Sequence, residues 1–126
     1  MMDLDFQERV RHWVTTVFGE KVLRDLPDRN HRFLEEALEL VQAGGCTKEE
    51  VLLLVDYVFD RPTGVPKQEV GGVMITLAAL CDTHRLNMEQ CGEVELHRVW
   101  GKVEEIRAKH LSKPKNSPLP GHRGAQ

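Results

Sequence analysis

Twelve consecutive residues, from Val70 to Cys81, carry no charged side chain. This run is too short to cross a membrane. It contains two glycines and two alanines, which allow a neighbouring helix to approach closely. The pattern predicts a helix over residues 69–81 at the centre of a helical fold.

Four further segments show apolar residues at helical spacing. The pattern predicts amphipathic helices over residues 5–18 and 88–109. It predicts a sandwiched helix over residues 28–43, where apolar residues cover more than half of the circumference. The segment from Thr47 to Glu50 has the form of a capping box, and the long apolar run 51–59 behind it indicates a buried helix.

These segments define an all-α fold, a bundle of four to five helices. We expect a single helical domain over residues 1–111. The remaining residues, 112–126, contain three of the six prolines and no core-forming cluster, which is typical of a disordered or extended C-terminal tail.

Composition excludes several classes of protein. A net charge of −3 and a pI near 6.1 give no global attraction for nucleic acid, and no basic recognition helix is present. The N-terminal residues do not form a signal peptide, and no stretch of 18 apolar residues occurs. We expect a cytoplasmic protein without nucleic-acid or membrane partners.

Glutamates on the predicted helix 28–43 are the strongest chemical signal. Glu36 and Glu39 stand three positions apart, so their carboxylates can converge on one ion, and Glu35 stands four positions before Glu39. Glu69 opens the apolar central helix. Two alternatives remain open: a solvated acidic face for the first group, and favourable placement at the helix dipole for Glu69.

The motif Glu35-Glu-Ala-Leu-Glu39-Leu, followed by Glu69-Val-Gly-Gly72, resembles the EExxEL and ExxD helices of MazG-like all-α nucleotide pyrophosphohydrolases. This superfamily includes MazG, the all-α dUTPases and phosphoribosyl-ATP pyrophosphohydrolase, and the resemblance covers roughly residues 30–108. It implies a site in which carboxylates bind Mg²⁺, with Mn²⁺ as a possible substitute. It also implies cleavage of a nucleoside triphosphate between the α and β phosphates.

The resemblance further implies residue roles. Glu36, Glu39 and Glu69 match metal ligands, and Glu35 or Glu36 would orient or deprotonate the attacking water. On the last predicted helix, Arg98 and Lys102 stand four positions apart and could bind the terminal phosphates. A solvated basic face is the alternative interpretation of that pair.

One expected metal ligand is missing, because Gly72 occupies the aspartate position of ExxD. Asp56, Asp60, Glu93 and Glu95 are candidates to replace it. Alternatively, catalysis is impaired and the chain acts as a helical binding or interaction module.

The last two predicted helices are too apolar for a lone chain of 126 residues to cover. The resemblance points in the same direction. We therefore expect a homodimer or a dimer of dimers.

Overall fold

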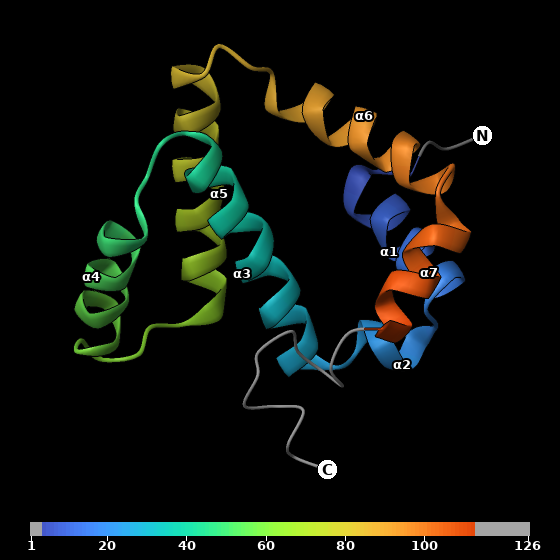
Figure 1. The fold of residues 1–126 in the computed structure, drawn as a ribbon, viewed down its shortest axis with the longest axis horizontal. Coiled ribbons are helices and arrows are strands. Elements are labelled where there is room, and N and C mark those ends of the chain that lie inside the picture. The colour runs from blue at the N-terminus through green and yellow to red at the C-terminus, as the bar shows by residue number, and fades with distance from the viewer. Residues whose placement is uncertain (1–3, 113–126) are drawn as a thin grey trace. The chain divides into compact units, whose positions relative to one another are not determined.

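The computed structural model describes residues 4–112 of the chain (Figure 1). Among these residues it contains seven α-helices and no strand, which confirms the all-α class but exceeds the expected four to five helices. The helices are α1 (Phe6–Val17), α2 (Glu20–Leu23), α3 (Leu26–Ala43), α4 (Lys48–Phe59), α5 (Pro66–Thr83), α6 (Met88–Trp100) and α7 (Val103–Ser112). Apart from Ser112, the predicted tail lies outside the described residues.

The prediction of one continuous helix over residues 88–109 is wrong. The chain breaks at Gly101 and Lys102 into α6 and α7. The backbone N–H groups of these two residues each donate to the carbonyl three residues earlier, at 3.1 Å, as in the tighter 3₁₀ turn. Glycine is a poor helix former, which explains the position of the break.

The short helix α2 was not predicted. It follows Gly19, whose backbone φ of 97° lies in the left-handed region that favours glycine. Glycine therefore ends α1, as expected, but the chain at once makes one more helical turn. A four-residue helix is too short for apolar periodicity to reveal it.

The chain divides into two compact units, and the division falls inside α3 and α6. Among the described residues, unit 1 comprises 4–38 and 93–112, and unit 2 comprises 39–92.

Unit 1 contains the buried residues of the described chain. Its apolar core is formed by Val14 and Val17 on α1 and Leu96 on α6. Next to this core, the Phe18 ring stacks edge-on against Trp13 and lies 4.7 Å from the His110 ring, measured between centroids. The end of α1 and the end of α7 therefore share one aromatic cluster.

Two arginines join distant segments of unit 1. Arg9 on α1 donates to both carboxylate oxygens of Glu93 on α6, at 2.7 and 2.5 Å. Arg107 on α7 donates to the backbone carbonyls of Val17 and Thr16, at 3.0 and 3.2 Å. Because these carbonyls belong to the last turn of α1, the Arg107 guanidinium satisfies acceptors that the helix itself leaves open.

The helices of unit 2 begin at residues whose local sequence favours a helix start. Thr47 caps α4, because its hydroxyl oxygen accepts the N–H of Glu50 at 3.1 Å while the Glu50 carboxylate accepts the N–H of Thr47 at 2.8 Å. Pro66 occupies the first turn of α5, where its missing N–H costs nothing. Within the described chain, we find no helix with both the length and the apolar character that a bilayer crossing requires.

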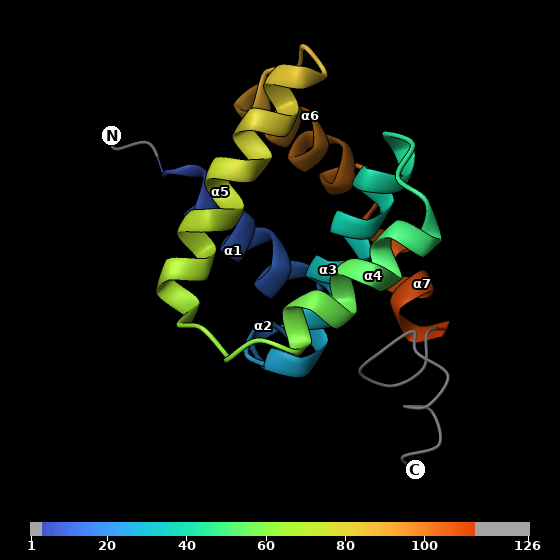
Figure 2. The same ribbon diagram turned by 90° about the vertical axis from the view of Figure 1, so that its left-hand side faces the viewer.

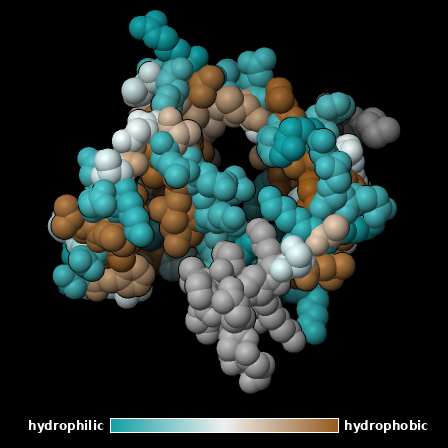
Figure 3. All heavy atoms as spheres, in the orientation of Figure 1, coloured by the Kyte–Doolittle hydropathy of each residue, from teal (hydrophilic) through white to brown (hydrophobic). Residues whose placement is uncertain are grey.

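The predicted burial of residues 51–59 and of residues 69–81 is not found within unit 2. No side chain of unit 2 is buried in the described structure, and most apolar side chains of α4 and α5 are more than one third exposed. Figure 3 shows hydrophobic atoms gathered over the part of the surface that these helices form. An apolar sequence predicts that the side chains of a helix are buried against another surface, but it does not identify that surface.

Candidate metal and phosphate-binding site

The α3 glutamates lie on one continuous helix. The helical register places Glu36 and Glu39 one turn apart, and both side chains are exposed. Glu35 is half-buried, and its carboxylate lies 3.2 Å from Arg32 Nη1. This ion pair restricts the Glu35 side chain, so α3 offers one carboxylate with a fixed cation beside it.

A buried aspartate anchors the same arginine. Asp28 is 6% exposed and accepts a hydrogen bond from Arg29 Nη2 at 2.8 Å. Its other carboxylate oxygen lies 3.8 Å from Arg32 Nε. A chain of charges thus runs along the first turns of α3 from Asp28 through Arg32 to Glu35. This row of alternating charges was not predicted, although the spacings of four and three residues along the helix indicate it.

Glu69 is exposed in the first turn of α5, as predicted from the sequence. Its carboxylate folds back against Gly64 in the preceding loop, and a Cβ at position 64 would collide with the carboxylate oxygen. Because Gly64 has no side chain, the Glu69 carboxylate has space beside the loop. The presence of Gly64 five residues before Glu69 was a signal that sequence analysis did not use.

Gly72 lies one turn after Glu69 on α5. Apart from its chain neighbours and the backbone of its own helix, no atom lies within 4 Å of the position that a Cβ would occupy there. The carbonyl of Gly72 accepts a hydrogen bond from the Thr76 hydroxyl at 2.9 Å. The position that lacks the expected aspartate is therefore open to a longer side chain.

The two candidate phosphate-binding residues do not share a helix. Arg98 lies on α6, whereas Lys102 lies in the turn after it, 3.8 Å from the carboxylate of Glu105. The predicted i,i+4 relation along one helix is therefore lost at Gly101. Both side chains are about half exposed and can be reached from solvent.

Arg98 is surrounded by carboxylates of unit 1. Its guanidinium donates to both oxygens of Glu95, at 2.9 and 2.7 Å. The Glu95 hydrogen bonds first, and then the charges of Glu95, Glu105 and Glu36, raise the pKa of the Arg98 guanidinium. The charge of Glu36, which lies 62 positions earlier in the sequence (98 − 36 = 62), makes the smallest of these contributions.

Two of the four candidate replacement ligands already have cationic partners. Hydrogen bonds from Arg9 lower the pKa of the Glu93 carboxyl, and those from Arg98 lower the pKa of the Glu95 carboxyl. Asp56 and Asp60 are exposed on α4 and at its C-terminal cap.

The donor groups suit a hard cation, since Glu36, Glu39 and Glu69 offer the carboxylate oxygens that Mg²⁺ prefers. Within residues 4–112, no three His, Cys, Asp or Glu side chains lie close enough together to share a metal ion. The chemistry of the donors therefore fits Mg²⁺, but the described structure does not gather the three predicted ligands into one group.

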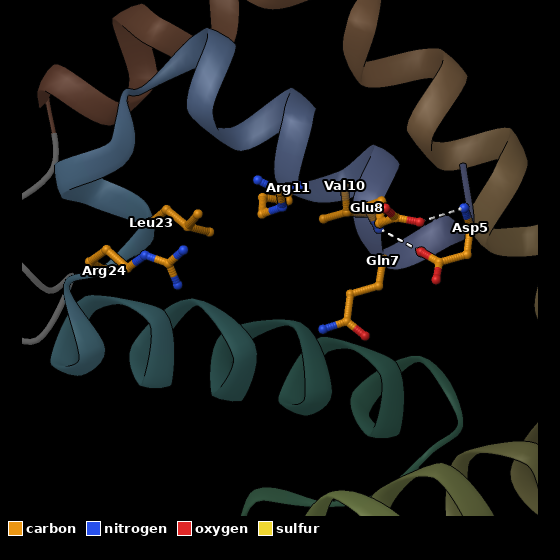
Figure 4. Close-up of a pocket in the computed structure, with 7 residues that line it drawn as sticks. All are labelled: Asp5, Gln7, Glu8, Val10, Arg11, Leu23 and Arg24. Carbon is orange, nitrogen blue, oxygen red and sulfur yellow. Dashed lines mark hydrogen bonds between the residues drawn. The ribbon is translucent and has the colours of Figure 1, made fainter. Parts of the chain in front are cut away.

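A recess of unit 1 lies beside α1 and α2 (Figure 4). Its volume is about 460 Å³, and it combines two arginines with the acidic capping box at the start of α1. None of the predicted site residues contributes to it. The lining residues are Asp5, Gln7, Glu8, Val10, Arg11, Leu23 and Arg24.

Comparisons of the chain with protein-family models, curated proteins and solved structures give no match. The function is therefore inferred from the residues of this chain alone.

Proposed function

We propose that the chain is a Mg²⁺-dependent nucleoside triphosphate pyrophosphohydrolase, which converts a ribo- or deoxyribonucleoside triphosphate to the monophosphate and pyrophosphate. Mn²⁺ would substitute for Mg²⁺, and the enzyme would act as a homodimer or a dimer of dimers. The proposal combines the MazG-like motif with the surroundings of its residues.

The observation that carries the proposal is that Glu36 and Glu39 lie one turn apart on α3 with both side chains exposed, while α6 presents the half-exposed Arg98 guanidinium. A triphosphate carries about four negative charges near neutral pH, so an acidic site needs cations to hold it. A metal ion held by the carboxylates and the Arg98 guanidinium would supply these cations. Guanidinium groups bind phosphate oxygens through two parallel hydrogen bonds, as Arg98 does here with a carboxylate.

In this proposal Glu36, Glu39 and Glu69 hold the metal. Mg²⁺ readily keeps several waters, so three carboxylates leave positions for phosphate oxygens and water. When bound, the ion would polarise the α-phosphate and lower the pKa of a coordinated water. The missing fourth carboxylate weakens metal binding but does not remove the chemistry.

The remaining residues act on water and on the leaving group. Glu35 or Glu36 accepts a proton from the attacking water, whose oxygen bonds to the α-phosphorus while the bond from that phosphorus to the α–β bridging oxygen breaks. The electron pair stays on the bridging oxygen, which leaves as part of pyrophosphate. Arg98 and Lys102 stabilise the negative charge that accumulates on this leaving group.

The test is hydrolysis of a panel of canonical and modified nucleoside triphosphates with Mg²⁺ or Mn²⁺, with the products identified as monophosphate and pyrophosphate. Glu36→Gln and Glu39→Gln should each abolish turnover. Glu49→Gln, which changes an exposed carboxylate of α4 outside the site, should leave turnover unchanged. Folded wild-type protein that hydrolyses no nucleotide in the panel would refute the proposal.

The second candidate is a helical interaction module that has lost catalysis. Two observations favour it: Gly72 in place of a ligand and the exposed apolar surface of unit 2. A ligand that binds only the native state raises the melting temperature. If the chain is the enzyme, Mg²⁺ should therefore raise its melting temperature, and Glu39→Ala should remove this effect. An interaction module without a metal site would show no change of melting temperature with Mg²⁺.

A further inference from the structure

The recess beside α1 and α2 belongs to unit 1 and contains none of the residues assigned to the metal site. Figures 1 and 2 show α2 next to α1, and these two helices make the most extensive backbone contact of any described helix pair. The volume of about 460 Å³ lies within the range of about 300–1,000 Å³ that is usual for small-molecule sites. Because all lining residues lie between positions 5 and 24, unit 1 alone forms the recess.

Arg11, which lines this recess from α1, is the exception among the described arginines of unit 1. Its guanidinium forms no hydrogen bond or ion pair with the described residues. The other described arginines of this unit all bind an acceptor, which is a carboxylate for Arg9, Arg24, Arg29, Arg32 and Arg98 and a backbone carbonyl for Arg107. Arg11 is exposed, so all five of its N–H donors are available to a ligand.

A second guanidinium reaches the recess from α2. Arg24 donates through Nε to Glu20 at 2.8 Å, while its two terminal nitrogens have no partner among the described residues. Figure 4 shows the Leu23 and Arg24 side chains extending from α2 toward α1. Two guanidinium groups from different helices therefore line one recess. A phosphate group suits this arrangement, because its several terminal oxygens can accept hydrogen bonds from both.

The remaining lining residues supply apolar surface and hydrogen-bond acceptors. Val10 and Leu23 are half-buried apolar residues. Asp5 and Glu8 each use one carboxylate oxygen in the capping box of α1, which leaves the second oxygen of each as an acceptor. Asp5 precedes Arg11 by six residues, or about 9 Å along the helix axis. The recess thus combines acceptors near the start of α1 with donors further along it.

We propose that the recess binds a nucleoside monophosphate whose base carries an amino group. Arg11 and Arg24 bind the phosphate, the apolar residues contact the base and the sugar, and the amino group donates to the second oxygen of Asp5 or Glu8. The two guanidinium and two carboxylate groups of the lining balance in charge, so inorganic phosphate alone would bind weakly. This inference does not rest on the proposed hydrolase activity, because the recess contains none of the residues assigned to catalysis.

Isothermal titration of the full chain with adenosine monophosphate tests the inference. The titration is done with EDTA, so that no divalent ion occupies the proposed metal site. The wild type should bind with a Kd below about 1 mM. Adenosine lacks the phosphate, and purine riboside monophosphate lacks the amino group, so each should bind at least about tenfold more weakly, as should inorganic phosphate.

Variants assign the binding to the recess. Arg11→Ala and Arg24→Ala should each weaken the binding of adenosine monophosphate by about tenfold or more, because each removes a charged phosphate contact. Lys21→Ala is the control, since it removes an exposed cation of α2 that does not line the recess. Glu36→Gln, which changes the proposed metal site, should leave the Kd unchanged.

A second measurement needs no variant. In nuclear magnetic resonance spectra of the wild type, adenosine monophosphate should shift the backbone amide signals of residues 5–24 more than those of any other segment. No binding at millimolar adenosine monophosphate would overturn the inference, as would unchanged affinity in Arg11→Ala or equally tight binding of inorganic phosphate. Loss of binding in Glu36→Gln would overturn it too, because the nucleotide would then occupy the proposed metal site. Failure of the chain to hydrolyse triphosphates would refute the proposed function and leave these outcomes unaffected.

Discussion

Arg98 donates two hydrogen bonds to Glu95, one turn earlier on α6, at 2.9 and 2.7 Å. The guanidinium is therefore bound in the bidentate geometry that it would use for a phosphate. In the proposed enzyme, the Glu95 carboxylate competes with the substrate for Arg98. Both side chains are more than half exposed, so this internal pair is weak enough to be displaced.

Glu95→Gln should lower the KM for the nucleoside triphosphate by about two- to fivefold, because it removes the competing charge of an exposed ion pair. Arg98→Ala should raise the KM. Steady-state kinetics measure both effects. The control is Glu89→Gln, which removes an exposed carboxylate from the first turn of the same helix. If KM stays unchanged in both Glu95→Gln and Arg98→Ala, Arg98 does not contact the substrate.

Gly72→Asp should strengthen Mg²⁺ binding by about tenfold, because it adds a carboxylate one turn from Glu69. The new side chain has room, since no atom other than those of its chain neighbours and its own helix backbone lies within 4 Å of a Cβ at that position. Isothermal titration with Mg²⁺ measures the effect. Gly71→Asp is a matched control, because position 71 is equally open but points about 100° away around α5. An equal gain from both variants would indicate nonspecific attraction by added charge.

The ion pair between Arg9 and Glu93 should stabilise unit 1 near neutral pH. This stabilisation should disappear at acidic pH, where Glu93 becomes protonated. Hydrogen bonds from Arg9 lower the pKa of the Glu93 carboxyl below its ordinary value of 4.5. A lowered pKa in the folded state means that the contribution is complete above the unfolded pKa and disappears as the pH falls through the folded pKa.

Thermal unfolding of the wild type and Arg9→Ala from about pH 3 to pH 7 tests this dependence. The difference in melting temperature should be constant above about pH 5 and should shrink below it. Arg24→Ala, which breaks the exposed pair with Glu20 within a single turn, should show a smaller difference. A difference between wild type and Arg9→Ala that persists unchanged at the acidic end would exclude the ion pair as its cause.

Leu96→Ala should lower the free energy of unfolding by about 2–5 kcal/mol, because it leaves a cavity in the core of unit 1. Leu96 is 8% exposed and, with Val14 and Val17, is one of the buried apolar residues of unit 1. Leu111→Ala should change the free energy of unfolding by less than about 0.5 kcal/mol. Denaturant unfolding followed by circular dichroism compares the two. Equal destabilisation by both variants would mean that Leu96 is not part of the core.

Most helices of this protein could be predicted from sequence because their signals are local. Caps such as that of Thr47 with Glu50, and glycines such as Gly19, act within one turn and do not depend on the rest of the chain. The pair of Asp5 and Glu8, which caps α1 in the same way, was an equally visible signal. The break at Gly101 was missed because apolar periodicity continues on both sides of it.

Sequence alone determined the helical class, most helix positions and the spacing of the glutamates on α3, since all of these follow from interactions within a few residues. Tertiary structure decided which groups meet across the chain. Examples are the Arg9 pair with Glu93 and the Arg107 contact with the end of α1. It also decided that the apolar helices of unit 2 are exposed, because burial depends on which surfaces are available to cover a helix and not on the hydrophobicity of the helix itself.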